Sequence, residues 1–201
     1  TGSSDLNEGS RKLAEQGVRE LIVIAQDTTY YGVDLYGKRM LAELLRRLCR
    51  IGGIEWVRLH YAYPTGFPDD VIEAMAADPK ICKYLDIPFQ HIADNQLLAM
   101  LRRHTKAEAM ELIGRLRRAI PDLALRTTLL VGYPGESEAD FAELEAFVRE
   151  VRFERLGVFA YSEEEGTHSA LHLRDDVPEE VKQDRVERIM ALQRDISLEN
   201  N

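Results

Sequence analysis

Apolar and polar positions follow one another along this chain in a regular order. Short apolar runs end in clusters of polar residues and glycine, and stretches with helical spacing lie between them. We predict strands over residues 20–26, 55–61, 84–89, 124–131 and 155–161. The runs recur roughly every 30 to 40 residues, which is typical of a parallel βα array. In such an array the carboxyl ends of the strands form the active site, so we expect function in the polar clusters.

The stretches between the strands have the apolar spacing of amphipathic helices. We predict helices over residues 37–51, 69–77, 97–101, 106–119, 137–149 and 178–197, and the end of another at 11–17. A βα array normally begins on a strand, so we expect a strand and its loop to be missing before Arg11. The predicted organisation is a disordered or added segment over 1–10, a partial TIM-type (β/α) barrel over 11–177, and a linker helix over 178–201 toward an absent C-terminal domain.

Composition and charge limit the classes of protein to which the chain can belong. The chain has 201 residues, of which 45% are hydrophobic, and this suits a soluble domain with a substantial core. No apolar stretch approaches the length of a membrane span, so we expect a cytoplasmic protein without a membrane partner. The net charge of −9 argues against direct binding of nucleic acid through the overall field of the chain. Cys49 and Cys82 lie too far apart for a metal-ligand pair, and no other cluster has metal-site spacing.

Three strand ends carry the candidate chemistry. Residues 132–136 (GYPGE) place two glycines directly after an apolar strand, where the backbone can approach a ligand closely; an ordinary strand-to-helix turn is the alternative. Residues 26–32 (QDTTYYG) offer several hydrogen-bonding side chains, or a capping turn. Gln90 and His91 follow the third strand, and a lone histidine is more often structural than a ligand. The chain has no Walker loop, no dinucleotide fingerprint and no obvious nucleophile. We therefore interpret it as a surface that binds a cofactor and carries no reactive centre of its own.

Several of these segments resemble the radical S-adenosylmethionine methylthiotransferases. The resemblance extends from Arg11 to Asn200 and is carried by QDTTYYG at 26–32, DIPFQH at 86–91, MLRRHT at 100–105, TTLLVGYPGE at 127–136 and YSEEEGT at 161–167. Relatives that modify tRNA typically have an arginine and a proline just before the last Gly-Thr. This chain has Glu164 and Glu165 there, as in the branch that modifies an aspartate of a small-subunit ribosomal protein.

The resemblance implies that S-adenosylmethionine lies across the strand ends. The cofactor-binding residues that it implies are Gln26, Asp27, Thr28, Gln90, His91, Arg126, Thr128, Gly132, Phe159, Ala160 and Tyr161. On the substrate side it implies Glu164, Glu165 and Arg102. None of these side chains is expected to transfer a proton, so their role is to position the reactants.

The resemblance also implies two 4Fe–4S clusters in the intact enzyme, one of them held by a CxxxCxxC loop after the first barrel strand. This chain has no such loop, so we expect it to provide no metal ligand and to be inactive alone. The intact enzyme would add a methylthio group to the β-carbon of an aspartate in a small-subunit ribosomal protein. Two alternatives remain: the core of a tRNA-modifying methylthiotransferase, and a noncatalytic barrel that acts as a binding module.

Overall fold

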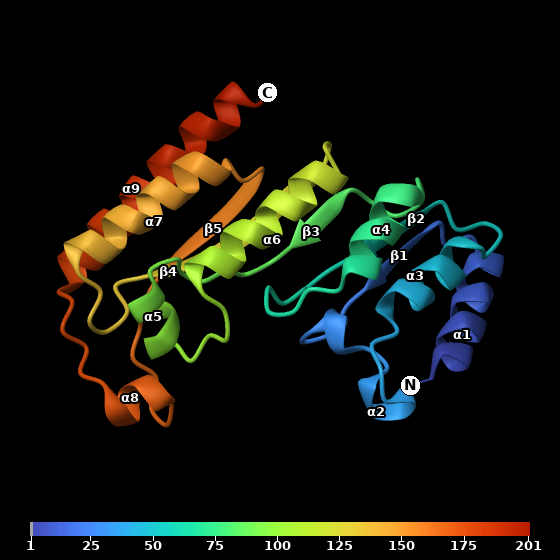
Figure 1. The fold of residues 1–201 in the computed structure, drawn as a ribbon, viewed down its shortest axis with the longest axis horizontal. Helices are drawn as coiled ribbons and strands as arrows, with labels where there is room; N and C mark the ends of the chain where they lie inside the picture. Colours follow the sequence, from blue (N-terminus) through green and yellow to red (C-terminus); the bar gives the residue numbers. More distant parts are fainter. Residues whose placement is uncertain (1) are drawn as a thin grey trace. The chain divides into compact units, whose positions relative to one another are not determined.

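The computed structural model describes residues 2–201, and the chain divides into two compact units (Figure 1). Unit 1 comprises the chain up to Ile87 together with Gly114–Ala124. Unit 2 comprises Pro88–Ile113 and Leu125–Asn201. The boundary falls within α6 (Lys106–Ala119).

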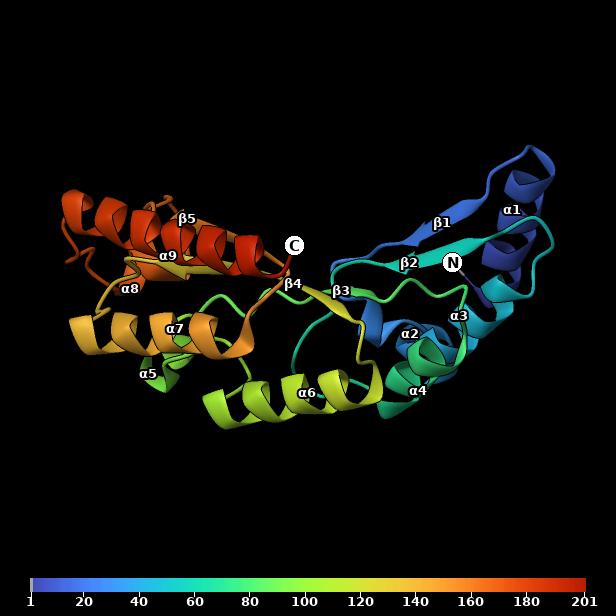
Figure 2. The ribbon, with the colours of Figure 1, turned by 90° about the horizontal axis from the view of Figure 1, so that it is seen from above.

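Unit 1 is built on the parallel pair of β1 (Glu20–Val23) and β2 (Trp56–Leu59), which run side by side in Figure 2. Leu21 lies opposite Val57, and these side chains are buried. The amphipathic helix α3 (Leu41–Cys49) packs against β2 and beside the N-terminal helix. The other elements of this unit are α1 (Ser3–Glu15), η1 (Thr28–Tyr30), α2 (Val33–Tyr36), α4 (Asp69–Ala77) and β3 (Tyr84–Asp86).

Unit 2 is built on the parallel pair of β4 (Ala124–Val131) and β5 (Arg155–Ala160). Every second residue of β4, from Leu125 to Val131, is buried. The rings of Phe89, Phe147 and Phe153 pack in the core with centroids 5.4–6.2 Å apart. Helix α9 (Glu179–Glu199) lies along α7 (Glu138–Val151) and packs against β5 (Figure 1). The short helices of this unit are α5 (Asp94–Ala99) and α8 (His168–His172).

The structure confirms the α/β class and the parallel strand pairs, and it corrects the start of the chain. We expected residues 1–10 to be either disordered or an added segment. Ser3–Glu15 form a continuous helix, which contradicts the disorder and leaves the other alternative a prediction. Two tyrosines distant in the sequence hold its first turn: Tyr36 Oη accepts from the Ser3 N–H at 2.9 Å, and Tyr31 Oη lies 2.9 Å from Ser3 Oγ. The polar composition of this segment does not reveal such tertiary contacts. Thr1 lies outside the described residues.

Two further segments complete unit 2. The stretch 163–177 contains α8, which begins after Thr167 because its side chain accepts from the Ala170 N–H. The predicted linker helix is α9, and it is an integral part of unit 2 because Ile189 and Ile196 are buried. That α9 also leads toward a further domain stays a prediction.

Candidate functional site

The half-exposed face of β4 and β5 in unit 2 brings polar and aromatic side chains together. Because β4 alternates, Arg126, Thr128 and Leu130 all lie on the face opposite to the buried core residues. The register places Gly157 beside Thr128 and Phe159 beside Leu130. The side chain of Phe159 is 63% exposed, and Gly157 leaves room beside Thr128. This face therefore offers hydrogen-bonding groups next to an accessible aromatic ring.

Gln90 is fixed beside this face by backbone hydrogen bonds. Its N–H donates to the Thr128 carbonyl at 3.0 Å, and its carbonyl accepts from the Leu130 N–H at 2.7 Å. Its φ of 69° lies in the left-handed region, which costs a residue with a side chain about 1–3 kcal/mol. Strain of this kind persists only where surrounding contacts enforce it, and it is concentrated at functional sites. The backbone of Gln90 is therefore held in a defined position beside this face.

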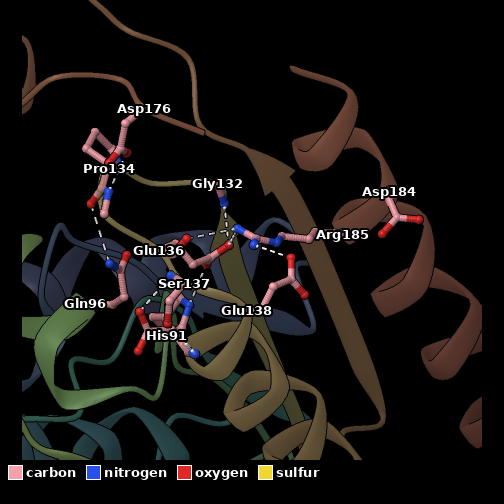
Figure 3. A network of polar contacts seen from close by, with 12 residues as sticks. His91, Gln96, Gly132, Pro134, Glu136, Ser137, Glu138, Asp176, Asp184 and Arg185 are labelled. Atoms are coloured by element: carbon pink, nitrogen blue, oxygen red, sulfur yellow. Dashed lines mark hydrogen bonds and ion pairs between the residues drawn. The ribbon is translucent and has the colours of Figure 1, made fainter. Parts of the chain in front are cut away.

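The loop between β4 and α7 carries a buried carboxylate at its end (Figure 3). Glu136 Oε1 accepts from the Gly132 N–H at 2.9 Å, and Oε2 lies 2.7 Å from His91 Nε2. The Ala93 N–H donates to His91 Nδ1 at 3.1 Å, so Nδ1 is unprotonated and Nε2 carries the proton that His91 donates to Glu136. Both nitrogens of this fully buried ring are therefore bonded within the protein.

Arg185 from α9 neutralises this carboxylate. Its Nη1 donates to Glu136 Oε1 at 2.7 Å, and its Nη2 donates to Glu138 Oε1 at 2.8 Å (Figure 3). The Arg185 side chain is only 4% exposed, so the ion pair with Glu136 is desolvated on both sides. The hydrogen bond from Arg185 lowers the pKa of Glu138 below its ordinary value.

The helix that follows the loop begins with a capping box. Ser137 Oγ accepts from the Asp140 N–H at 3.1 Å, and Asp140 Oδ2 accepts from the Ser137 N–H at 2.9 Å. Burial by itself raises the pKa of Asp140, but hydrogen bonds from Ser137 and Asn95 outweigh it and lower the pKa below its ordinary value. The end of the loop is thus fixed from its own side as well as from α9.

Gly132 is required by the packing of α9. Its φ is 72°, and a Cβ atom there would lie 2.3 Å from Lys182 Cγ. The Lys182 side chain is buried: its Nζ lies 2.5 Å from Asp175 Oδ2 and 5.2 Å from the centroid of the Tyr161 ring. The Tyr161 hydroxyl lies 3.0 Å from Ser169 Oγ and is a donor to it. The close approach that the sequence predicted at Gly132 is therefore made by a side chain of the protein itself.

The structure brings Gly132, Ala160 and Tyr161 together at the carboxyl ends of β4 and β5, where Ala160 pairs with Val131 and the Tyr161 N–H donates to the Val131 carbonyl at 2.8 Å. Thr128 lies further back along β4, and Arg126 pairs with Arg155 at the start of β5. His91 is not part of this surface. Because the ring is fully buried and both nitrogens are bonded, it is not placed to contact a cofactor, and we withdraw it from that set.

Of the three predicted cofactor residues of unit 1, Asp27 and Thr28 make hydrogen bonds within the protein. Asp27 Oδ1 accepts from the N–H and the hydroxyl of Thr29 at 2.9 and 2.6 Å, which is the capping turn that the sequence left open. Thr28 is buried, and its N–H and hydroxyl both donate to the Tyr61 carbonyl at 3.1 Å. Gln26 is exposed. A contact of these three residues with a cofactor stays a prediction.

The predicted substrate-side residues differ in exposure. Glu164 and Glu165 are both exposed, and the Glu164 carbonyl accepts from the Thr167 hydroxyl at 2.8 Å. Arg102 is half-buried, and its Nη2 donates to the Pro88 carbonyl at 2.5 Å. The guanidinium is thus directed to the loop after β3, and a contact of Arg102 with substrate stays a prediction.

Sequence reasoning missed Lys182 and Arg185, the two α9 residues that hold the loop. A signal was present, because both residues fall on the same helical stripe as the buried Ile189, Gln193 and Ile196. Basic residues on the apolar stripe of a helix must find buried partners, and this indicates a polar network beneath α9.

The cysteines of the chain do not fit an iron–sulfur cluster, whose ligands are thiolates. Among residues 2–201, no group of three or more His, Cys, Asp or Glu could hold a metal ion. Burial, followed by the charge of Asp78, raises the pKa of Cys49 to about 12, and burial also raises the pKa of Cys82. Since a thiol must lose its proton to bind iron, a raised pKa disfavours both cysteines as ligands.

None of the helices within residues 2–201 combines the length and the apolar composition that are needed to cross a membrane.

Several proteins that carry the same name have high sequence identity to this chain. Proteins named ribosomal protein uS12 methylthiotransferase RimO are 58% identical over 192 residues in Christiangramia forsetii, 59% over 189 in Flavobacterium johnsoniae and 54% over 197 in Porphyromonas gingivalis. The matches cover 96%, 94% and 98% of this chain but 42%, 43% and 45% of the relatives. The chain thus spans less than half the length of these relatives. The identities confirm the resemblance to methylthiotransferases.

The fold is that of radical SAM enzymes. Coproporphyrinogen III oxidase HemN from Escherichia coli superposes with a TM-score of 0.67 at 17% identity over 96% of this chain and 46% of its own. The methyltransferase TsrM from Kitasatospora setae superposes with a TM-score of 0.62 at 17% identity over 79% of this chain and 31% of its own. These likenesses confirm the predicted barrel-type fold. Residues 4–148 match the family model of the radical SAM superfamily, and the chain belongs to this superfamily.

Proposed function

We propose that this chain is the cofactor-binding core of a radical-SAM methylthiotransferase that modifies an aspartate of ribosomal protein uS12. The observation that carries the proposal is the identity of 53–59% with proteins named for that activity. The matched stretch covers 94–98% of the chain. The proposed activity is that of the whole enzyme. The matches to this chain cover 42–45% of the length of its relatives.

The β4–β5 face has the chemistry to hold S-adenosylmethionine, which combines a charged amino-acid end with an adenosine. Gln90, Arg126 and Thr128 supply polar groups for the amino-acid end and the ribose, and the exposed ring of Phe159 offers a surface on which a base can stack. The backbone from Gly132 and from 159–161 borders the adenosine in this proposal. When bound, the cofactor supplies the methyl group and the adenosyl group of the reaction. The residues of the chain bind and orient it.

The iron–sulfur chemistry of the family has no ligands among the described residues. We propose that this chain contributes no ligand to either of the two clusters expected for the intact enzyme, because both of its thiols have a raised pKa and no metal-binding cluster exists among residues 2–201. The chain by itself then has no methylthiotransferase activity.

The proposed protein substrate approaches through the exposed loop after β5. Glu163, Glu164 and Glu165 form an exposed acidic segment there, and the whole chain carries a net charge of −9. A basic ribosomal protein complements this charge, whereas the phosphates of an RNA are repelled by it. The cytoplasm, where ribosomes lie, is the proposed location.

The test places this chain in a relative of full length. Residues 1–201 replace the matching segment of the Flavobacterium johnsoniae relative, and the chimera is expressed in cells that lack their own enzyme. Mass spectrometry should detect a methylthio group on uS12. Modification of tRNA with none on uS12 would establish the tRNA-type alternative, and a folded chimera that modifies neither would overturn the proposal.

A charge variant tests the substrate side. The chimera with Glu164→Gln and Glu165→Gln should bind S-adenosylmethionine as before and modify uS12 more slowly. The matched control neutralises two exposed glutamates on α9, Glu180→Gln and Glu187→Gln, which changes the net charge equally at another place. Equal loss in both variants would show that only the overall charge matters.

A further inference from the structure

We propose that Arg185 and Lys182 of α9 are positioning residues for the cofactor surface, because they fix the conformation of the loop 132–136 through Glu136 and Gly132. The effect on the cofactor rests on the proposed function. The effect on the loop does not, since it follows from contacts of the described residues alone.

The loop contains two glycines in the left-handed region of backbone conformation. Gly132 and Gly135 have φ values of 72° and 82°, and glycine adopts many backbone conformations at little cost. One short-range backbone bond, from the Glu136 N–H to the Tyr133 carbonyl at 3.0 Å, closes the turn. From outside, Asp176 accepts from the Gly135 N–H at 2.8 Å (Figure 3). Gln96 Nε2 also donates to the Pro134 carbonyl at 3.5 Å, and the Tyr133 hydroxyl donates to the Ala99 carbonyl at 3.2 Å. At Gly132, the contacts considered next are those with Glu136 and α9.

Glu136 transmits the position of α9 to Gly132. The same oxygen, Oε1, accepts from Arg185 Nη1 at 2.7 Å and from the Gly132 N–H at 2.9 Å. His91 donates to the other oxygen, and the carboxylate is completely buried. A buried carboxylate without a cation is strongly unfavourable, so loss of Arg185 favours a turn of the Glu136 side chain toward water. This turn weakens the bond that holds Gly132.

Lys182 restrains the same glycine by contact. Its aliphatic stem lies directly over Gly132, where an added Cβ atom would be 2.3 Å from Lys182 Cγ. The ammonium group is held by Asp175, and it lies over the ring of Tyr161. Lys182 thus joins the end of β4 to the residue that follows β5. One turn of α9 therefore sets both loop contacts that border the β4–β5 face.

Arg188 provides a matched control on the same helix. Its guanidinium lies over the Phe141 ring at 4.7 Å, as that of Arg185 does at 5.4 Å, and it donates to Glu145 at 2.7 Å. Both arginines therefore join α9 to α7. Only Arg185 also contacts Glu136, so Arg188→Met loosens the helix packing without removing the bond to the loop.

The experiment compares Arg185→Met, Arg185→Lys and Arg188→Met in the 201-residue chain. Hydrogen exchange of a peptide that contains residues 131–136 measures the order of the loop, and titration calorimetry measures the affinity for S-adenosylmethionine. We expect Arg185→Met to speed exchange at Gly132 and to weaken binding by about tenfold or more each, which is the scale of a lost buried ion pair. Arg185→Lys should restore part of both, and Arg188→Met should change each by less than about twofold.

The possible results separate the positioning role of Arg185 from the proposed cofactor site. Equal effects of Arg185→Met and Arg188→Met, or unchanged exchange in Arg185→Met, would overturn the positioning role. Faster exchange with unchanged affinity would also overturn it, because the loop would then not serve the cofactor surface. If the unaltered chain binds no S-adenosylmethionine, the proposed cofactor site fails, while the exchange comparison still decides whether α9 orders the loop.

Discussion

Two glycines in the loop between β4 and α7 share a backbone conformation but not their surroundings, so replacing each by alanine separates strain from crowding. Gly132 and Gly135 have φ values of 72° and 82°. An added Cβ atom at Gly132 would lie 2.3 Å from Lys182 Cγ and 3.0 Å from its Cδ. At Gly135 the nearest atom is Gln96 Nε2, at 3.9 Å.

The expected losses of stability follow from these distances. The left-handed conformation costs alanine about 1–2 kcal/mol at either position. Crowding adds about 1–3 kcal/mol at Gly132 only, because Asp175 and the Tyr161 ring restrain Lys182. We expect Gly135→Ala to lower the free energy of unfolding by about 1–2 kcal/mol and Gly132→Ala by about 2–5 kcal/mol.

Urea unfolding followed by circular dichroism measures both values. A double variant identifies the cause, because Lys182→Ala removes the two nearest atoms and leaves Lys182 Cβ at 3.2 Å from the added methyl group. Gly132→Ala with Lys182→Ala should therefore lose less stability than the sum of the single variants. A Gly132→Ala variant as stable as Gly135→Ala, or strictly additive losses in the double variant, would refute the reasoning.

Three further predictions concern other parts of the chain. Burial, with a smaller effect of Arg102, lowers the pKa of His104 from 6.5 to about 4. The unfolded chain therefore binds the proton more strongly, and the free energy of unfolding should fall as the pH drops from about 6.5 toward 4. Urea unfolding of His104→Leu should lack this part of the pH dependence, and a variant with the same pH profile as the unaltered chain would contradict the prediction. Anaerobic reconstitution with iron and sulfide should leave the chain without iron, since both thiols have a raised pKa; stoichiometric iron with cluster absorbance would overturn the view that ligands are lacking. Among the described residues β1 pairs with β2 alone and exposes Ile22, so light scattering should show association that Ile22→Lys reduces, whereas a monodisperse monomer would prove the prediction wrong.

The local sequence determined most of the secondary structure. Helix α6 and strand β4 occupy the predicted residues, because the burial of alternate or helically spaced apolar residues is visible in the sequence itself. The helix start at Ser137 follows from residues that are three positions apart. The helix from Ser3 was missed for the opposite reason, since the tyrosines that hold it are 28 and 33 positions away.

The sequence also located the strand ends and singled out Gly132, Gln90 and His91. Only the tertiary structure decided what each residue does there. His91 and Glu136 are 45 positions apart, and Glu136 and Arg185 are 49 apart, yet they form one buried network. Whether a polar group faces a ligand or a buried partner depends on which distant side chain the fold brings to it. The local sequence pattern does not predict that partner. The pattern of apolar residues therefore specified where the candidate site lies, and long-range packing decided which of its polar groups have buried partners within the protein.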